Sequence, residues 1–131
     1  MKAYLIFLIF AAFWGWAGAY YDHLLIKDGA RMSFETKTVG NVIVGLAMFF
    51  SIVFFSPVTE LLRFSVLCLI SCIVWTIFQD GFLGLYLKKG WCYLGTGTWD
   101  EAMRNTFHGN RSFMFWRVGY VIFFSLIYFA L

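Results

Sequence analysis

The run "LLRFSVLCLISCIVWTIFQDGFLGLYL", residues 61–87, decides the fold because it is long and apolar enough to cross a membrane. It carries no charge from Phe64 to Gln79 and, apart from Asp80, stays apolar to Leu87. An α-helix rises ~1.5 Å per residue, so about 20 apolar residues cross the ~30 Å hydrocarbon core of a bilayer. The run therefore predicts a spanning helix over residues 61–80, which extends to 87 if the helix continues through Asp80.

Three other apolar runs of similar length, residues 3–21, 39–56 and 112–131, predict three more spans. The 131 residues are 62% hydrophobic and only 13% charged, which leaves too little polar surface for a soluble domain. Helices are expected throughout, because an open sheet cannot satisfy its edges in lipid. The sequence thus predicts an all-α, integral membrane four-helix transmembrane bundle, with residues 1–131 forming a single transmembrane domain.

The distribution of basic residues predicts the orientation of this bundle. The loops between spans one and two and between spans three and four carry Lys27, Arg31, Lys37, Lys88, Lys89, Arg104 and Arg111, whereas the opposite side carries only Lys2 and Arg63. Loops rich in Lys and Arg stay in the cytoplasm. We therefore expect both large loops in the cytoplasm and both termini outside, in the inner membrane of a bacterium.

A short interfacial helix is predicted between spans three and four, over residues 99–107. Thr98 and Glu101 have the spacing of a capping box, and Gly109 suits the position that ends a helix. Apolar residues fall on one side of this helix and charged residues on the other, which is typical of a helix lying in the membrane interface.

Small residues recur at four-residue intervals in span one, at Ala11, Gly15 and Ala19. Such a row lets a neighbouring helix approach closely. Span three carries a second row, small and weakly polar, on one helical face. Its members are Ser65, Cys68, Cys72, Thr76 and Gln79. We expect this face to point inward, either as a packed seam of the bundle or, in a channel, as the lining of a pore.

The topology also gathers polar and aromatic residues at the cytoplasmic face, where they form a candidate ligand or headgroup cluster. Its members are Asp22, His23, Glu35, Asp80, Trp91, Tyr93, Asp100 and Arg117. Asp80 is the most informative member, because a charge inside a span costs ~2.5–3.5 kcal/mol unless it is paired. Arg117 is the candidate partner by depth, and a structural Asp80–Arg117 bond competes with a role for Asp80 in binding a ligand.

A metal ion and an anionic lipid headgroup are the two ligands that these residues suit. Carboxylates and imidazoles are common metal ligands, so Asp22, His23, Glu35 and Asp80 are the candidate metal ligands. The sequence has no HExxH or CxxC motif, and neighbours such as Asp22 and His23 point ~100° apart on a helix. The basic residues of the second cytoplasmic loop suit an anionic headgroup, although the positive-inside bias alone also explains them.

The run "FQDGFLGLYLKKGWCYLGTGTWDEA", residues 78–102, resembles a motif of small uncharacterised four-helix membrane proteins of bacteria and their phages. The matching residues are Phe78, Asp80, Gly90, Trp91, Tyr93, Gly95 and Asp100. Gln79 separates Phe78 from Asp80, which are adjacent in the family pattern. The resemblance implies a functional cytoplasmic face and no particular activity.

Three functions remain open at this stage. The first is a small polar ligand site at the cytoplasmic interface, for a metal ion or a lipid headgroup, with catalysis undecided. The second is a homo-oligomeric pore or holin-like protein lined by span three. The third is a structural or regulatory subunit of a larger membrane complex. The lipid bilayer is the expected partner in all three, and no nucleic-acid-binding motif is present.

Overall fold

The computed structural model describes residues 2–27, 61–94 and 98–131, together with positions 40, 42–43, 45–47, 50 and 54. The described elements are all helices: α1 (Lys2–Lys27), α3 (Leu61–Tyr86), α4 (Thr98–Thr106) and α5 (Asn110–Ala130). Three of them are long and apolar enough to cross a membrane, over Tyr4–Lys27, Leu62–Tyr86 and Asn110–Ala130. The all-helical prediction is thereby confirmed for the described residues, and three of the predicted spans coincide with helices that could cross a membrane. The span predicted over residues 39–56 lies largely outside the described residues, so a four-span bundle stays a prediction.

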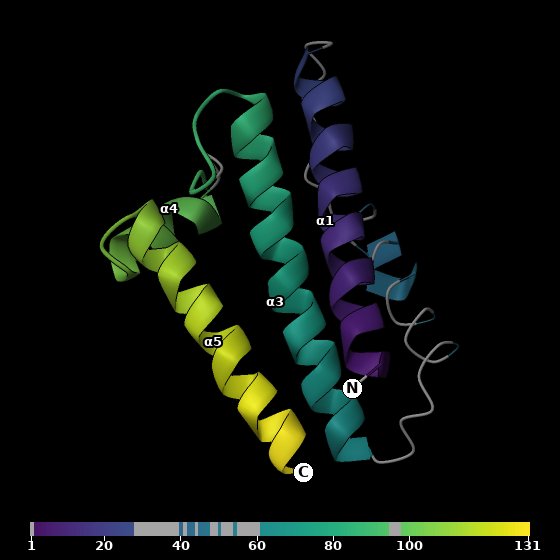
Figure 1. The fold of residues 1–131 in the computed structure, drawn as a ribbon. Coiled ribbons are helices and arrows are strands. Elements are labelled where there is room, and N and C mark those ends of the chain that lie inside the picture. Colours follow the sequence, from purple (N-terminus) through teal and green to yellow (C-terminus); the bar gives the residue numbers. More distant parts are fainter. Residues whose placement is uncertain are drawn as a thin grey trace.

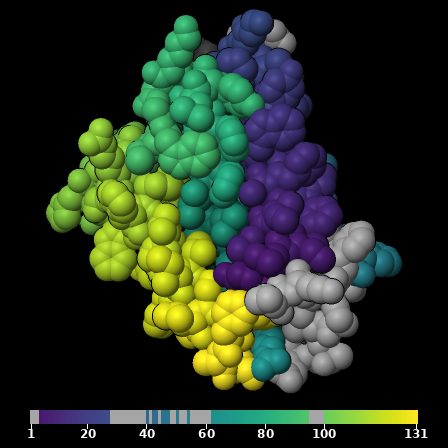
Figure 2. Space-filling model, in the orientation of Figure 1, coloured from purple at the N-terminus to yellow at the C-terminus, as the bar shows by residue number. Residues whose placement is uncertain are grey.

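The three long helices lie side by side with α3 in the middle (Figure 1). α1 and α3 run in the same direction, α5 runs in the opposite direction, and the N and C labels lie at the same end (Figure 1). The space-filling view shows side chains of α3 between those of α1 and α5 on the visible face (Figure 2). We call the end towards which α1 and α3 finish, and from which α5 starts, the basic end; α5 starts lower in the view than α1 and α3 finish (Figure 1). Lys27, Lys88, Lys89 and Arg111 lie at or next to these helix termini in the chain.

Close packing of α1 on α3 follows from the predicted row of small residues. Ala11 and Ala19 are fully buried, and a Cβ atom built on Gly15 would lie only 2.6 Å from the Trp75 carbonyl oxygen and 2.7 Å from Phe78 Cβ. The backbones can approach this closely only because residue 15 has no side chain. The row in span one is therefore the contact surface for α3, as predicted.

The apolar core lies between α1 and α3 towards the chain termini. It consists of Tyr4, Phe7, Ala11, Val66, Leu67, Ile70 and Val74, with residues of α5 packed against it. Tyr4 joins α1 to α5, because its hydroxyl lies 2.5 Å from Ser125 Oγ and its ring contacts those of Tyr128 and Phe129. Of the three long helices that the structure describes, α5 is the most exposed, so most of its apolar surface faces the surroundings.

Helix boundaries differ from the predicted ones where a charged residue is buried. We expected span one to end at residue 21, before Asp22, but α1 continues to Lys27. The helix continues because Asp22 is buried and hydrogen-bonded to α3. Helix α3 likewise continues through Asp80 to Tyr86. This agrees with the longer of the two spans predicted for this run, which extends to residue 87.

Helices α3 and α4 end in the same way, with a non-glycine residue in the left-handed conformation. Lys88 has φ 57° and the Lys89 amide donates to the Gly84 carbonyl at 2.8 Å. His108 has φ 57° and the Gly109 amide donates to the Arg104 carbonyl at 2.9 Å. Both patterns are Schellman motifs. The prediction that Gly109 takes the first position after the helix is therefore wrong by one residue, because His108 occupies it.

Replacing Lys88 with glycine is expected to stabilise the protein by about 1 kcal/mol, because glycine adopts the left-handed conformation without the steric cost that lysine bears. Thermal unfolding in detergent checks this change. Lys89→Gly is the matched control, since Lys89 does not have a positive φ. An equal gain from both variants would show that the left-handed conformation is not the cause.

Candidate functional site

Two consecutive residues of α3, Gln79 and Asp80, are the centre of a polar network within the helix bundle. Asp80 lies six residues before the end of α3 at Tyr86, which places it roughly 9 Å along the helix from that end. Consecutive helical residues point about 100° apart, so Gln79 and Asp80 can reach different neighbouring helices. Gln79 bonds α1 and Asp80 bonds α5.

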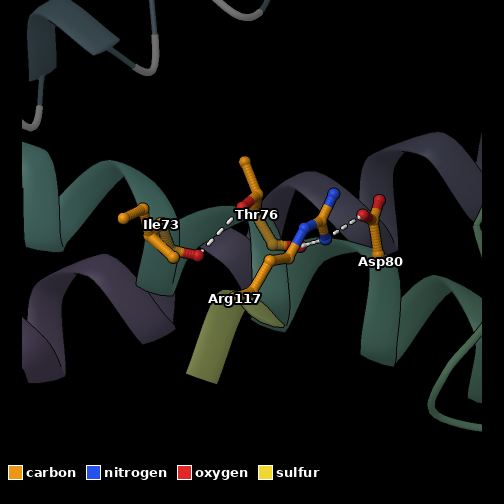
Figure 3. Close-up of polar contacts among 4 residues, drawn as sticks. All are labelled: Ile73, Thr76, Asp80 and Arg117. Carbon is orange, nitrogen blue, oxygen red and sulfur yellow. Dashed lines mark hydrogen bonds and ion pairs between the residues drawn. The ribbon is translucent and has the colours of Figure 1, made fainter. Parts of the chain in front are cut away.

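Asp80 forms an ion pair with Arg117, as the matching depths in the sequence predicted. Arg117 Nη1 donates to Asp80 Oδ2 at 2.5 Å and lies 3.4 Å from the Thr76 carbonyl oxygen, one turn earlier in α3 (Figure 3). The Arg117 guanidinium also lies over the Phe113 ring, 4.2 Å from its centroid. The pair is mostly shielded, since the Arg117 and Asp80 side chains are 13% and 25% exposed. A cation and an anion thus compensate each other between two apolar helices.

Asp22 joins the network from α1, through a contact that the sequence did not indicate. Gln79 Nε2 donates to Asp22 Oδ2 at 3.1 Å, and Asp22 is only 9% exposed. Gly18, one turn before Asp22, lies beside the same amide: a Cβ atom there would lie 3.4 Å from Gln79 Cδ, an ordinary van der Waals contact. Asp22 and Asp80, two of the candidate ligand residues, are therefore both bonded to side chains of the bundle itself.

Among the described residues, His23 has no recorded contact with Gln79 or Asp80 and belongs to an aromatic cluster near the end of α3. Its ring stacks on Tyr86, with centroids 5.1 Å apart, and the Tyr86 hydroxyl accepts a hydrogen bond from Trp16 Nε1 at 2.8 Å. Tyr20 packs edge-on against the same Tyr86 ring. Because α1 is continuous through residues 22 and 23, Asp22 and His23 point in different directions and serve different neighbours.

The loop after α3 folds back along that helix. Trp91 packs against Phe82 and Phe78, with ring centroids 5.1 and 5.8 Å away, and a Cβ atom on Gly81 would lie 2.5 Å from its indole ring. Gly84 gives the same loop room, since a Cβ atom there would collide with the Gly90 carbonyl oxygen. The sequence analysis did not recognise these two glycines of α3 as the place where Trp91 packs.

Trp91 and Tyr93, which we expected to cover a ligand cluster, are thus held on the side of α3. Lys89 Nζ lies 4.8 Å from the centroid of the Tyr93 ring, a cation–π contact. Asp100 lies in the first turn of α4, where the helix dipole favours an acid. The network thus holds Asp22 on Gln79 and Arg117 on Asp80, two consecutive residues of α3. His23, Trp91, Tyr93 and Asp100 have other surroundings.

Metal binding by Asp22, His23, Glu35 and Asp80 stays a prediction. Within the part of the chain that the structure describes, no three His, Cys, Asp or Glu side chains are grouped so that they could hold a metal ion. Glu35 lies outside the described residues.

The small, weakly polar face of α3 lies beside the buried face and not within it. Leu67, Ile70 and Ser71 are fully buried, whereas Ser65 and Cys72 are exposed. Cys68, Thr76 and Gln79 are partly buried, and Gln79 bonds Asp22. This face, expected to point inward, thus turns partly outward between the described helices.

The cations of the basic end differ from Arg117 in being exposed. Lys27, Lys88, Lys89 and Arg111 are exposed, and none of them forms an ion pair with a carboxylate in the described ranges 2–27, 61–94 and 98–131. Lys88 and Lys89 are flanked in the chain by Tyr86, Trp91 and Tyr93, aromatic residues of the kind that anchor proteins at the membrane surface, and Lys89 lies over the Tyr93 ring. No model of a known protein family matches the chain, and the comparisons with curated proteins and with solved structures find no match either.

Proposed function

We propose that the protein is an integral membrane protein whose basic end binds the phosphate groups of anionic lipids at the cytoplasmic surface of a bacterial inner membrane. The observation that carries this proposal is the contrast between the two sets of charges. Asp80 and Arg117 compensate each other within the bundle, whereas Lys88, Lys89 and Arg111 are exposed and are not used in ion pairs among the described residues.

The position of these cations supports a lipid ligand over a soluble one. Lys88 and Lys89 immediately follow the third apolar helix, and Arg111 lies in the first turn of α5. Both places are where a spanning helix meets the headgroups, and each Lys or Arg near an anionic surface contributes about 1 kcal/mol of attraction. The positive-inside rule then assigns this end to the cytoplasm.

A metal ion is the less favoured ligand, because Asp22 and Asp80, two of the acids that would bind it, have other partners. Displacing Arg117 from Asp80 would leave a guanidinium uncompensated in the apolar layer, at a cost of several kcal/mol. A lipid phosphate at the basic end requires no such rearrangement.

The test is the thermal stability of the protein in nanodiscs of phosphatidylcholine alone or with phosphatidylglycerol. We expect phosphatidylglycerol to stabilise the wild type, by about 1 kcal/mol for each exposed cation that it engages, and expect high salt to weaken this gain. The triple variant Lys88→Gln/Lys89→Gln/Arg111→Gln should lose most of it. Lys2→Gln, which removes a cation from the opposite end, is the control and should keep it. An undiminished gain in the triple variant would disprove the proposal.

A further inference from the structure

A hollow of about 470 Å³ lies on the outer surface of α5, next to the basic end. It is lined by Arg111, Ser112, Phe115, Trp116 and Gly119. Gly119 forms an open part of it, because a Cβ atom built there would meet nothing within 4 Å. The hollow is separate from the polar network, whose residue on this helix is Arg117.

The lining changes from polar to apolar along the helix axis. Arg111 and Ser112 lie in the first turn of α5, at the basic end, and Gly119 lies seven residues after Ser112, roughly 10 Å further into the span. Between them Phe115 and Trp116 are 75% and 53% exposed. The hollow thus has a cation and a hydroxyl group at the membrane surface and aromatic side chains at greater depth. A phospholipid has the same order, with its phosphate at the surface and its acyl chains deeper.

We infer that this hollow binds one anionic glycerophospholipid. Arg111 binds its phosphate, for which a guanidinium offers paired donors, and the Ser112 hydroxyl is a second donor to the same group. One acyl chain lies between Phe115 and Trp116 and passes over Gly119. The inference rests on the proposed function, since it gives one of the exposed cations a defined site and one class of ligand.

The exposed apolar face of α5 could instead bind a second copy of the chain. Ser112 and Gly119 are both small and lie on one face, as in many helix contacts within membranes. Two copies packed in parallel through this face would bring their Arg111 side chains together at the same depth, and like charges repel. A lipid phosphate complements Arg111, so charge favours the lipid.

Native mass spectrometry of protein extracted from phosphatidylglycerol-containing membranes tests the inference. The wild type is expected to retain one phosphatidylglycerol molecule per chain and to lose it neither to phosphatidylcholine nor to inorganic phosphate. Gly119→Leu fills the hollow without touching any cation, and we expect retention to fall at least tenfold. Ala130→Leu adds three carbon atoms, one fewer than Gly119→Leu, at an exposed site near the other end of α5 and should leave retention unchanged.

Each other outcome overturns a specific part of the inference. Equal retention by wild type and Gly119→Leu would exclude this hollow as the site, and the headgroup proposal would stand if phosphatidylglycerol still stabilises both in nanodiscs. A lipid-free wild-type dimer that Gly119→Leu dissociates would assign the hollow to a second copy. Loss of both retention and stabilisation in the wild type would overturn the proposed function as well.

Discussion

Replacing Arg117 with methionine is expected to lower the free energy of unfolding by about 3 kcal/mol, because Asp80 would then be a largely shielded carboxylate without its partner cation. The variant also loses the contact with the Thr76 carbonyl and the cation–π contact with Phe113. Methionine keeps most of the volume and the apolar stem of the side chain, so lost packing contributes little. Reversible unfolding in detergent or bicelles provides the measurement.

Arg111→Met is the matched control for this prediction. It removes the same type of charge from the same helix, but Arg111 is exposed and forms no ion pair with the described carboxylates. We expect a change within about 0.5 kcal/mol in uncharged detergent. If the two variants were equally stable, Asp80 would not depend on Arg117 for its charge compensation.

The second large effect is expected at Gly15, where alanine should destabilise the protein by about 1–3 kcal/mol. The added Cβ atom would lie 2.6 Å from the Trp75 carbonyl and 3.0 Å from the Gln79 backbone nitrogen, and these backbone atoms cannot move without separating α1 from α3. Because Gln79 also bonds Asp22, such a separation would disturb the polar network too. Thermal unfolding in detergent measures the loss.

Gly119→Ala makes the same substitution in α5, where nothing lies within 4 Å of the added Cβ atom. It should be neutral or slightly stabilising, since alanine has the higher helix propensity. A loss for Gly119→Ala as large as that for Gly15→Ala would indicate a general effect of replacing glycine in these helices. The close contact of α1 with α3 would then not explain the result.

The parts of the fold that the sequence predicted correctly depend on local or one-dimensional properties. Hydropathy and length were enough to locate α3 and α5, and depth along two antiparallel helices was enough to pair Asp80 with Arg117. The capping-box pattern predicted α4 to within one residue at either end. Each of these inferences requires only distance along the helix axis, which sequence spacing provides.

The parts that were not predicted depend on how the helices are rotated about their axes. Asp22 was expected at the surface as a ligand, but the rotation of α1 turns it towards Gln79, which is 57 positions away in the chain. The place of Trp91 required knowing that Gly81 and Gly84 face the returning loop. Two glycines three residues apart in a bulky helix were the available signal, although close packing on another helix would explain them equally well.

The measurement that tests the account most directly is the coupling free energy between Asp80 and Arg117, from a double-mutant cycle of Asp80→Leu, Arg117→Met and the double variant. We predict that each single variant is destabilised, that the double variant is nearly as stable as the wild type, and that the coupling exceeds about 1.5 kcal/mol. Additive effects of the two substitutions would contradict the account. Asp80 would then not be held by Arg117, and a ligand site built around this acid would become the better explanation of the polar network.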